Sequence, residues 1–178
     1  MSTHSHKLAA RQQMAFSTVH TEQPILAQGH ATEVLEALKS LLVEVLDVAL
    51  CARHARWNVR GPHCLPLHDL LEEVGETLDR QADRIARRIG ALGGTAHGTA
   101  HHIATRSSIK PYPVEVTEGQ DHLEAVALRL GLLSAEARLS IYDAKRRGDP
   151  VTIKVIVEAN AMIDHVLWLV ESHRRATH

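Results

Sequence analysis

A histidine and a glutamate four residues apart form a pair that could bind a metal. His68 and Glu72 occur in the segment LPLHDLLEEV, and a spacing of four places both side chains on one face of an α-helix. Imidazole and carboxylate ligands together suit iron or zinc. The plain alternative is a surface histidine beside a solvated glutamate, which the spacing alone does not exclude.

Two amphipathic stretches in the first half of the chain would position this pair. The first begins at Thr32 and ends before Gly61, and its apolar residues recur at helical spacing. The second has Pro66 in its first turn, where proline is tolerated, and stops at Gly93 and Gly94. The histidine and the glutamate therefore lie near the start of the second predicted helix.

Two further helices are expected in the second half of the chain. Thr117 and Gln120 form a capping box at the start of the third helix, which continues towards Gly148. Asp149 is expected to cap the fourth helix, with Pro150 in its first turn. Short links within each pair of helices predict two antiparallel hairpins.

The link between the two hairpins bears on the type of bundle. Residues 95–116 contain two prolines and no sustained period, so we expect a long crossover that could hold a short helix. Such a crossover is typical of an all-α, ferritin-like four-helix bundle, although spacing alone does not exclude a simple up-and-down bundle. The four helices contain no Glu-x-x-His motif, which argues against a di-iron site inside the bundle.

Composition agrees with one helical domain. Hydrophobic residues make up 44% of the chain and aromatic residues only 3%, which favours packed helices. The formal net charge of -1 indicates no whole-molecule attraction to nucleic acid. We expect a flexible tail over residues 1–30, a bundle over 31–174, a short tail over 175–178 and no membrane span. Cys51 and Cys64 match no zinc or redox spacing and are expected to be reduced thiols.

The run ARWNVRGPHCLPLHDLLEEV, followed by DRQADRIARRIGALGG, resembles the Dps family of DNA-protecting mini-ferritins. The family pattern is roughly A-H-W-N-x-R-G, then a histidine and an acid four apart, then D-x-x-x-E-R and L-G-G. The resemblance continues through SIKPYP, QDHL and Trp168, and covers about residues 30–173. It implies a cytoplasmic or nucleoid-associated shell of twelve subunits, built on two-fold dimers, that takes up iron and oxidises it with peroxide or oxygen.

The same resemblance implies where iron would bind. In the family, two histidines and an acid of one subunit face an aspartate and a glutamate of another. His68, Glu72 and Asp83 match three of these positions, whereas Arg56 replaces the first histidine and Arg87 replaces the glutamate. A guanidinium group has no lone pair to donate, so neither arginine can ligate a metal. We therefore expect a weakened iron site.

The two arginines permit two interpretations. With Glu72 and Asp83 they could form bidentate ion pairs across the subunit interface, in place of the metal. Alternatively, Arg87 simply pairs with Asp83 four residues away on its own helix, which says nothing about function. His54 is no easy substitute for the missing histidine, because a shift of two residues turns it about 200° around the helix from Arg56.

Histidines in the crossover could form a second metal site. His97, His101 and His102 lie close together in the sequence, and His97 and His101 could meet on a helical backbone to bind zinc or copper weakly. The alternative is solvated loop histidines.

Contacts with DNA would depend on the termini. Lys7, Arg11, Arg174 and Arg175 are the full cations there, and many copies in a shell would multiply weak contacts. We expect any DNA binding to be weak and sensitive to salt and pH.

Two functions remain open from the sequence. One is a mini-ferritin that oxidises Fe(II) at a weakened site and stores the ferric product. The other is a structural or DNA-associated protective shell whose ferroxidase site has been replaced by arginine–carboxylate ion pairs. The resemblance favours iron sequestration and protection against oxidative or starvation stress, whereas the arginines favour loss of the oxidation step.

Overall fold

The computed structural model describes residues 28–61 and 64–176, and the regular structure in this part of the chain is helical. Arg60 and Glu118 form an isolated bridge between chain segments. The helices are α2 (Gln28–Asn58), α3 (Cys64–Ala91), α4 (Ala100–Arg106), α5 (Gly119–Arg146) and α6 (Pro150–Ala176). The extent of the two predicted tails stays a prediction, because residues 1–27 and 177–178 lie outside the described part.

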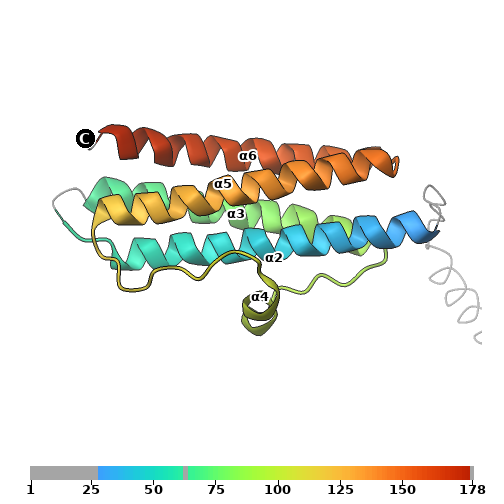
Figure 1. The fold of residues 1–178 in the computed structure, drawn as a ribbon, viewed down its shortest axis with the longest axis horizontal. Coiled ribbons are helices and arrows are strands. Elements are labelled where there is room, and N and C mark those ends of the chain that lie inside the picture. Colours follow the sequence, from blue (N-terminus) through green and yellow to red (C-terminus); the bar gives the residue numbers. More distant parts are fainter. Residues whose placement is uncertain (1–27, 62–63, 177–178) are drawn as a thin grey trace, which may run out of the picture.

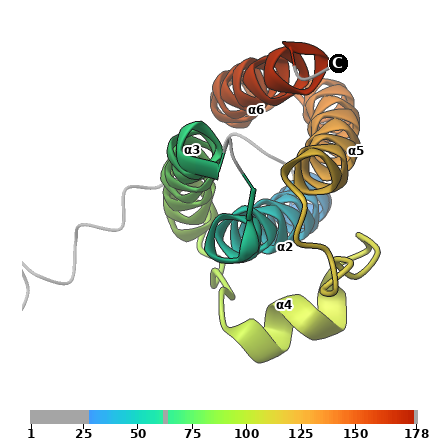
Figure 2. The same ribbon diagram turned by 90° about the vertical axis from the view of Figure 1, so that its left-hand side faces the viewer.

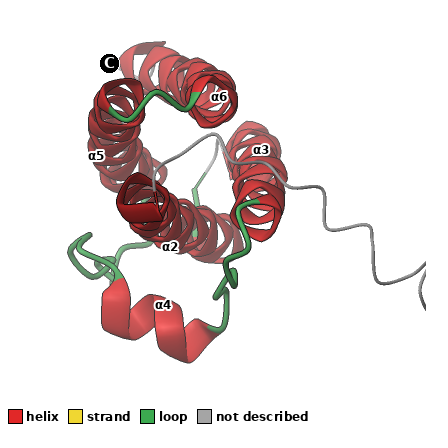
Figure 3. Cartoon of the chain, turned by 90° about the vertical axis from the view of Figure 1, so that its right-hand side faces the viewer, coloured by secondary structure: helices red, strands yellow, loops and turns green. Residues whose placement is uncertain are grey.

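Two antiparallel hairpins form the bundle (Figure 1). α2 packs against α3 and α5 against α6, and the hairpins are joined by contacts of α2 with α5 and of α3 with α6. Viewed along the bundle, the four long helices surround one core while α4 lies outside it (Figure 3). The predicted all-α bundle is confirmed.

The crossover from α3 to α5 runs back along the bundle and carries α4 against the outer side of α2 (Figures 1 and 2). Two acids on α2, one of them buried, hold it there. Glu44 is only 3% exposed and accepts hydrogen bonds from the Ser107 hydroxyl at 2.9 Å and the Ser108 amide at 2.8 Å. The same Ser107 hydroxyl oxygen also lies 2.6 Å from a carboxylate oxygen of Asp47. The predicted long crossover, with a short helix in it, is therefore present.

Aliphatic side chains from all four long helices fill the core. Leu38, Leu78, Leu130 and Ile163, one from each helix, are fully buried. Burying a side chain of this size contributes about 1.5–3 kcal/mol. A core of this kind needs few aromatic residues, in agreement with the composition.

The predicted cap of the last helix is present and also ties α3 to α6. Asp149 accepts a hydrogen bond from the Thr152 amide at 3.0 Å and is held by the Arg88 guanidinium at 3.0 and 3.1 Å. Burial alone would raise the pKa of Asp149, but the Thr152 bonds and the Arg88 charge outweigh it and leave the pKa below its usual value. The carboxylate is therefore charged at neutral pH.

The predicted capping box at the start of α5 is wrong. The residue that precedes the helix is Glu118, which makes no side-chain cap, and the Gln120 side chain instead donates to the Arg174 carbonyl at 3.3 Å. The Thr117 carbonyl accepts the Arg60 amide at 2.9 Å. This bond draws Thr117 into the bridge to the α2–α3 loop, and the helix begins one residue later than the capping box predicts.

No helix in the described ranges, 28–61 and 64–176, is both long and apolar enough to cross a membrane.

Candidate metal site and its arginine substitutions

The predicted site residues divide between two places on the α2–α3 hairpin. Arg56 is in the last turn of α2, opposite His68 and Glu72 near the start of α3, because the two helices are antiparallel. Asp83 lies eleven residues beyond Glu72 on α3, which is about 16 Å along the helix axis. One chain therefore brings Arg56 to Glu72, with His68 one turn away on α3, and holds Asp83 and Arg87 apart from them.

Arg56 forms an ion pair with Glu72 inside a single chain. Their side chains are 31% and 52% exposed, so the pair lies at the surface and not in the core. It lines a shallow groove of about 160 Å³ between α2 and α3. A second pair, Arg53 with Asp79 at 3.0 Å, crosses the same groove. Arginines of α2 thus bind acids of α3 at two successive levels.

This ion pair opposes metal binding in two ways. The Glu72 carboxylate is already engaged, and the Arg56 cation lies beside the position that a metal would take. Two unit charges about 4 Å apart interact by about 4 kcal/mol at an effective dielectric constant of 20, so a dication that close to Arg56 would be opposed by roughly twice as much. This figure is an upper bound, because the side chain is long enough to move away.

The remaining predicted ligands, His68 and Asp83, are unengaged within the part of the chain that the structure describes. His68 is half-buried, and its ring has no partner among the described residues. Asp83 and Arg87 are exposed, and neither forms an ion pair in the described part of the chain. The simple i, i+4 pair between these two is therefore not formed. Within residues 28–61 and 64–176, no three histidine, cysteine or acidic side chains converge to hold a metal.

A largely buried polar cluster lies between α2, α5 and the crossover, on the side of α2 turned away from Arg56. We call Cys51, His54, Tyr112, His122 and Arg129 the Tyr112 cluster. The Tyr112 hydroxyl is 2.7 Å from Nδ1 of His122, and its ring meets the edge of the His54 ring with centroids 5.2 Å apart. His54 thus faces Tyr112. This agrees with the rotation of about 200° around the helix that separates His54 from Arg56.

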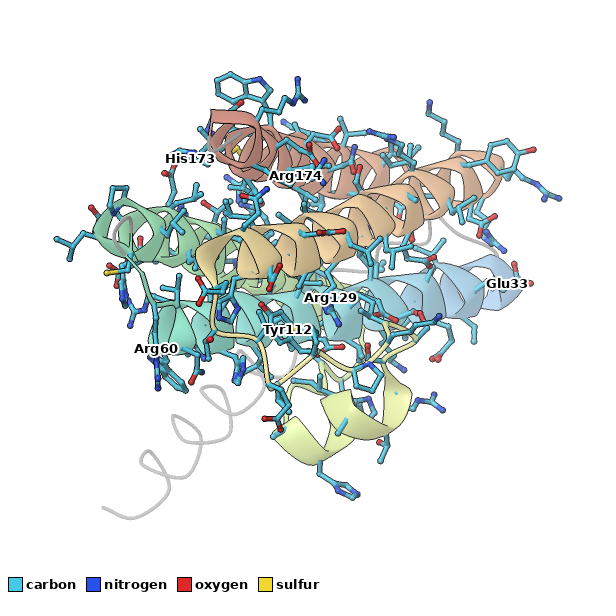
Figure 4. All side chains as sticks on the ribbon, turned by 60° about the vertical axis from the view of Figure 1, so that its left-hand side comes forward. Glu33, Arg60, Tyr112, Arg129, His173 and Arg174 are labelled. Atoms are coloured by element: carbon cyan, nitrogen blue, oxygen red, sulfur yellow. The ribbon has the colours of Figure 1, made fainter. Side chains whose placement is uncertain are left out.

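Arg129 closes the cluster from α5 (Figure 4). Its guanidinium carbon lies 4.8 Å from the centre of the Tyr112 ring. Its nitrogens donate to the carbonyls of Lys110 at 3.0 Å and Pro111 at 2.6 Å in the crossover, and to Ala125 at 2.9 Å. Sequence reasoning missed Arg129, because no motif marks an arginine whose partners are main-chain carbonyls.

Burial shifts the pKa of three groups in the cluster, raising it for Cys51 and Tyr112 and lowering it for His122. Burial and, to a smaller extent, His54 lower the pKa of His122, against the opposing effects of the Asn58 backbone and Asp121. Nε2 of His54 and Nε2 of His122 are both buried without a hydrogen-bond partner in the described part of the chain. His122 is therefore neutral at pH 7, and its ring packs as part of the core.

The two cysteines are free. Burial, assisted by Asp47 and opposed by Arg129, raises the pKa of the Cys51 thiol to about 11. A thiol of this kind is unreactive at neutral pH, because the thiolate is the reactive form. Cys64, at the start of α3, is partly exposed.

The other predicted contact residues are placed in part. Lys7 and Arg11 lie outside the described residues. Arg174 and Arg175 lie in the last turn of α6, and both approach Glu171, at 3.0 and 3.9 Å. Figure 4 shows Arg174 at that end of the bundle. One carboxylate thus offsets part of the cationic charge that we expected DNA to meet.

The crossover histidines also differ from expectation. The ring beside His97 belongs to His102, with centroids 5.0 Å apart, and His101 is exposed. α4 begins only at Ala100, so His97 and His101 do not share a helical face.

Comparison with known proteins agrees with the geometry. Residues 35–177 match the ferritin family, described as a ferritin-like domain. A DNA protection during starvation protein of Agrobacterium fabrum is 33% identical over 154 residues, which cover 86% of this chain and 95% of the relative. The fine tangled pili major subunit of Haemophilus ducreyi is 26% identical over 149 residues, covering 83% and 77%. A solved Dps structure from Mycobacterium smegmatis superimposes with a TM-score of 0.80 at 28% identity, covering 84% of this chain and 91% of that one.

With the helical bundle, the long crossover and the motif between Arg56 and Gly94, these matches establish that the chain belongs to the Dps family of ferritin-like proteins.

Proposed function

We propose that this protein is a Dps-type mini-ferritin shell that sequesters iron and protects the cell under oxidative or starvation stress, and that its inter-subunit ferroxidase site is largely inactive. The ion pair between Arg56 and Glu72 is the observation that carries this proposal. It engages an acid that family resemblance assigns to iron and places a cation beside it. The side chains present do not fit a dinuclear iron centre.

The remaining half of the altered site would come from a second subunit. Asp83 and Arg87 are exposed and unpaired within the described chain, and they lie about 16 Å and about 22 Å along α3 from Glu72. A two-fold partner would bring its own Asp83 and Arg87 towards the Arg56–Glu72 pair and form a balanced set of two arginines and two carboxylates. We propose that two-fold dimers of this kind assemble into a dodecamer.

Iron binding and oxidation by the assembled protein test the proposal. Fe(II) is titrated anaerobically into the wild type, peroxide is added, and bound ions per subunit pair and the oxidation rate are measured. We expect the wild type to bind few ions tightly and to oxidise Fe(II) near the protein-free rate. The double substitution Arg56→His with Arg87→Glu should restore binding and faster oxidation.

Matched controls are available on the same helices. Arg53→His changes the arginine one level along the same groove, and Arg84→Glu changes an α3 arginine that pairs with Glu158 at 3.2 Å. Together they repeat the change in charge without touching the family ligand positions, so we expect no gain in oxidation. Wild-type oxidation as fast as that of the Arg56→His, Arg87→Glu protein would contradict the proposal.

A DNA-associated shell without ferroxidase activity is the second candidate. The same ion pair favours it, because the pair removes the oxidation step and leaves the fold intact. Pairing of Arg174 and Arg175 with Glu171 predicts weak binding. A gel shift should therefore reveal DNA binding that disappears at physiological salt and pH 8. Tight binding under those conditions would require another cationic surface.

A further inference from the structure

A cleft of about 480 Å³ lies between α2 and the crossover, away from the altered iron site. Its lining includes Lys39 and Ser40 of α2, together with His97, His102 and Arg106 from the crossover and α4. The cleft exists because α4 packs on α2 from outside the bundle (Figure 2).

The fixed charges of the cleft favour an anion. Lys39 donates to Glu36, which also lines the cleft, at 2.8 Å, so these two charges largely offset each other. Arg106 has no carboxylate partner in the described part of the chain. Two cations and one carboxylate leave a net charge of +1 before any histidine is protonated. The Ser40 hydroxyl also makes no hydrogen bond to a described residue.

The histidine pair places two imidazole rings side by side in the cleft. The rings of His97 and His102 are 5.0 Å apart and tilted by 36°, and neither ring makes a hydrogen bond to a described residue. Histidine ordinarily changes its charge between about pH 5 and 8. Two imidazolium groups this close repel each other, and an anion between them would offset the repulsion. Protonation and anion binding should therefore strengthen each other.

We propose that this cleft binds a tetrahedral oxyanion of the phosphate class, held by Arg106 and by the protonated pair of His97 and His102. The groups that face the pair are Glu36 and Lys39 from α2 and Arg106 from α4. A metal on the two histidines is the competing occupant, but both cations would oppose it. Glu36 could act as a third ligand of such a metal only if it left its ion pair with Lys39.

Sulfate is the most direct probe, because it keeps the same charge between pH 6 and 8 and isolates the titration of the protein. Isothermal titration of the assembled full-length protein with sulfate should give tighter binding at pH 6 than at pH 8. The double substitution His97→Ala with His102→Ala should abolish that difference. Arg106→Gln should weaken binding about tenfold at both pH values, as expected for loss of one charge-assisted hydrogen bond.

His101→Ala and Lys110→Gln are matched controls. They change one imidazole and one cation of the crossover that are exposed and lie outside the cleft. They should leave sulfate binding unchanged, and circular dichroism should confirm that all variants are folded. The proposal is overturned if sulfate does not bind, or if binding survives the Arg106 and histidine substitutions. It is also overturned if the histidine pair binds Zn²⁺ more tightly as the pH rises and sulfate does not compete.

Phosphate could reach the cleft free or as part of a nucleic acid backbone. Inorganic phosphate and a short DNA duplex are therefore titrated in parallel. If the Arg106 and histidine substitutions weaken both ligands, the cleft takes backbone phosphate as well. If they weaken only inorganic phosphate and sulfate, the cleft takes the free anion. Either result supports the oxyanion site, and neither depends on the state of the iron site.

Discussion

The buried ion pair between Arg88 and Asp149 should be one of the strongest polar contacts in the bundle. Its side chains are 11% and 4% exposed, and Arg88 also donates to the Thr152 hydroxyl at 2.9 Å. The substitution Arg88→Met would leave a buried carboxylate without its cation, which typically costs about 3–5 kcal/mol. Because Thr152 still donates two bonds to Asp149, we expect the lower end, about 3 kcal/mol.

Urea unfolding at one fixed protein concentration measures this loss, since assembly itself contributes to stability. The contribution should be full at pH 7. The pKa of Asp149 is lowered in the folded chain, so the unfolded chain takes up the proton first as the pH falls. The difference between wild type and Arg88→Met should therefore shrink only below about pH 4.

Arg138→Met is the matched control. Arg138 contacts Asp164 at 3.1 Å, close to the distance in the buried pair, but the two side chains are 63% and 39% exposed. Exposed pairs contribute about 0–1 kcal/mol. The reasoning would be refuted if Arg88→Met cost no more than Arg138→Met, because burial would then not determine the strength of these pairs.

Three further outcomes are expected. Iodoacetamide at pH 8 should modify Cys64 well before Cys51, as followed by mass spectrometry. A pKa raised from 9.0 to about 11 leaves Cys51 with about a hundredfold less thiolate than an ordinary cysteine. Equal rates would contradict the burial of Cys51. The free energy of unfolding of the wild type should fall between about pH 6.5 and 5, because the lowered pKa of His122 makes the folded chain resist protonation there. His122→Gln should flatten this fall. His101→Gln, at an exposed site, should not. Gly93→Ala should lower the free energy of unfolding by about 1 kcal/mol in thermal unfolding, because Gly93 has a φ of 78°. Gly90→Ala, on the exposed helix surface, should be neutral or stabilising.

Helix periodicity and cap residues predicted most of the fold. Asp149 was identified as a cap from its position before Pro150, and the structure confirms it. The capping box at Thr117 was wrong because a contact from outside the segment, the Arg60 amide, fixes the carbonyl of Thr117. Local motifs describe what a segment prefers in isolation, and a tertiary hydrogen bond can move a helix start by one residue.

The site was predictable only where the family pattern supplied positions. Arg56 and Arg87 were identified as substitutions from the motif, but the pairing of Arg56 with Glu72 depends on how α2 and α3 align. The approach of His97 to His102 likewise follows from the start of α4 at Ala100, which spacing did not determine. Residues brought together by packing between elements leave no periodic signal in the sequence.

The way Arg129 holds the crossover has a consequence for how the sequence can vary. Its partners in the crossover are the carbonyl oxygens of Lys110 and Pro111, and every residue type supplies a carbonyl. Side chains at these two exposed positions are therefore free to change during evolution or engineering, provided that the backbone path and Arg129 are retained. Positions 110 and 111 are places on the crossover at which new recognition residues can be introduced without redesigning the bundle beneath them.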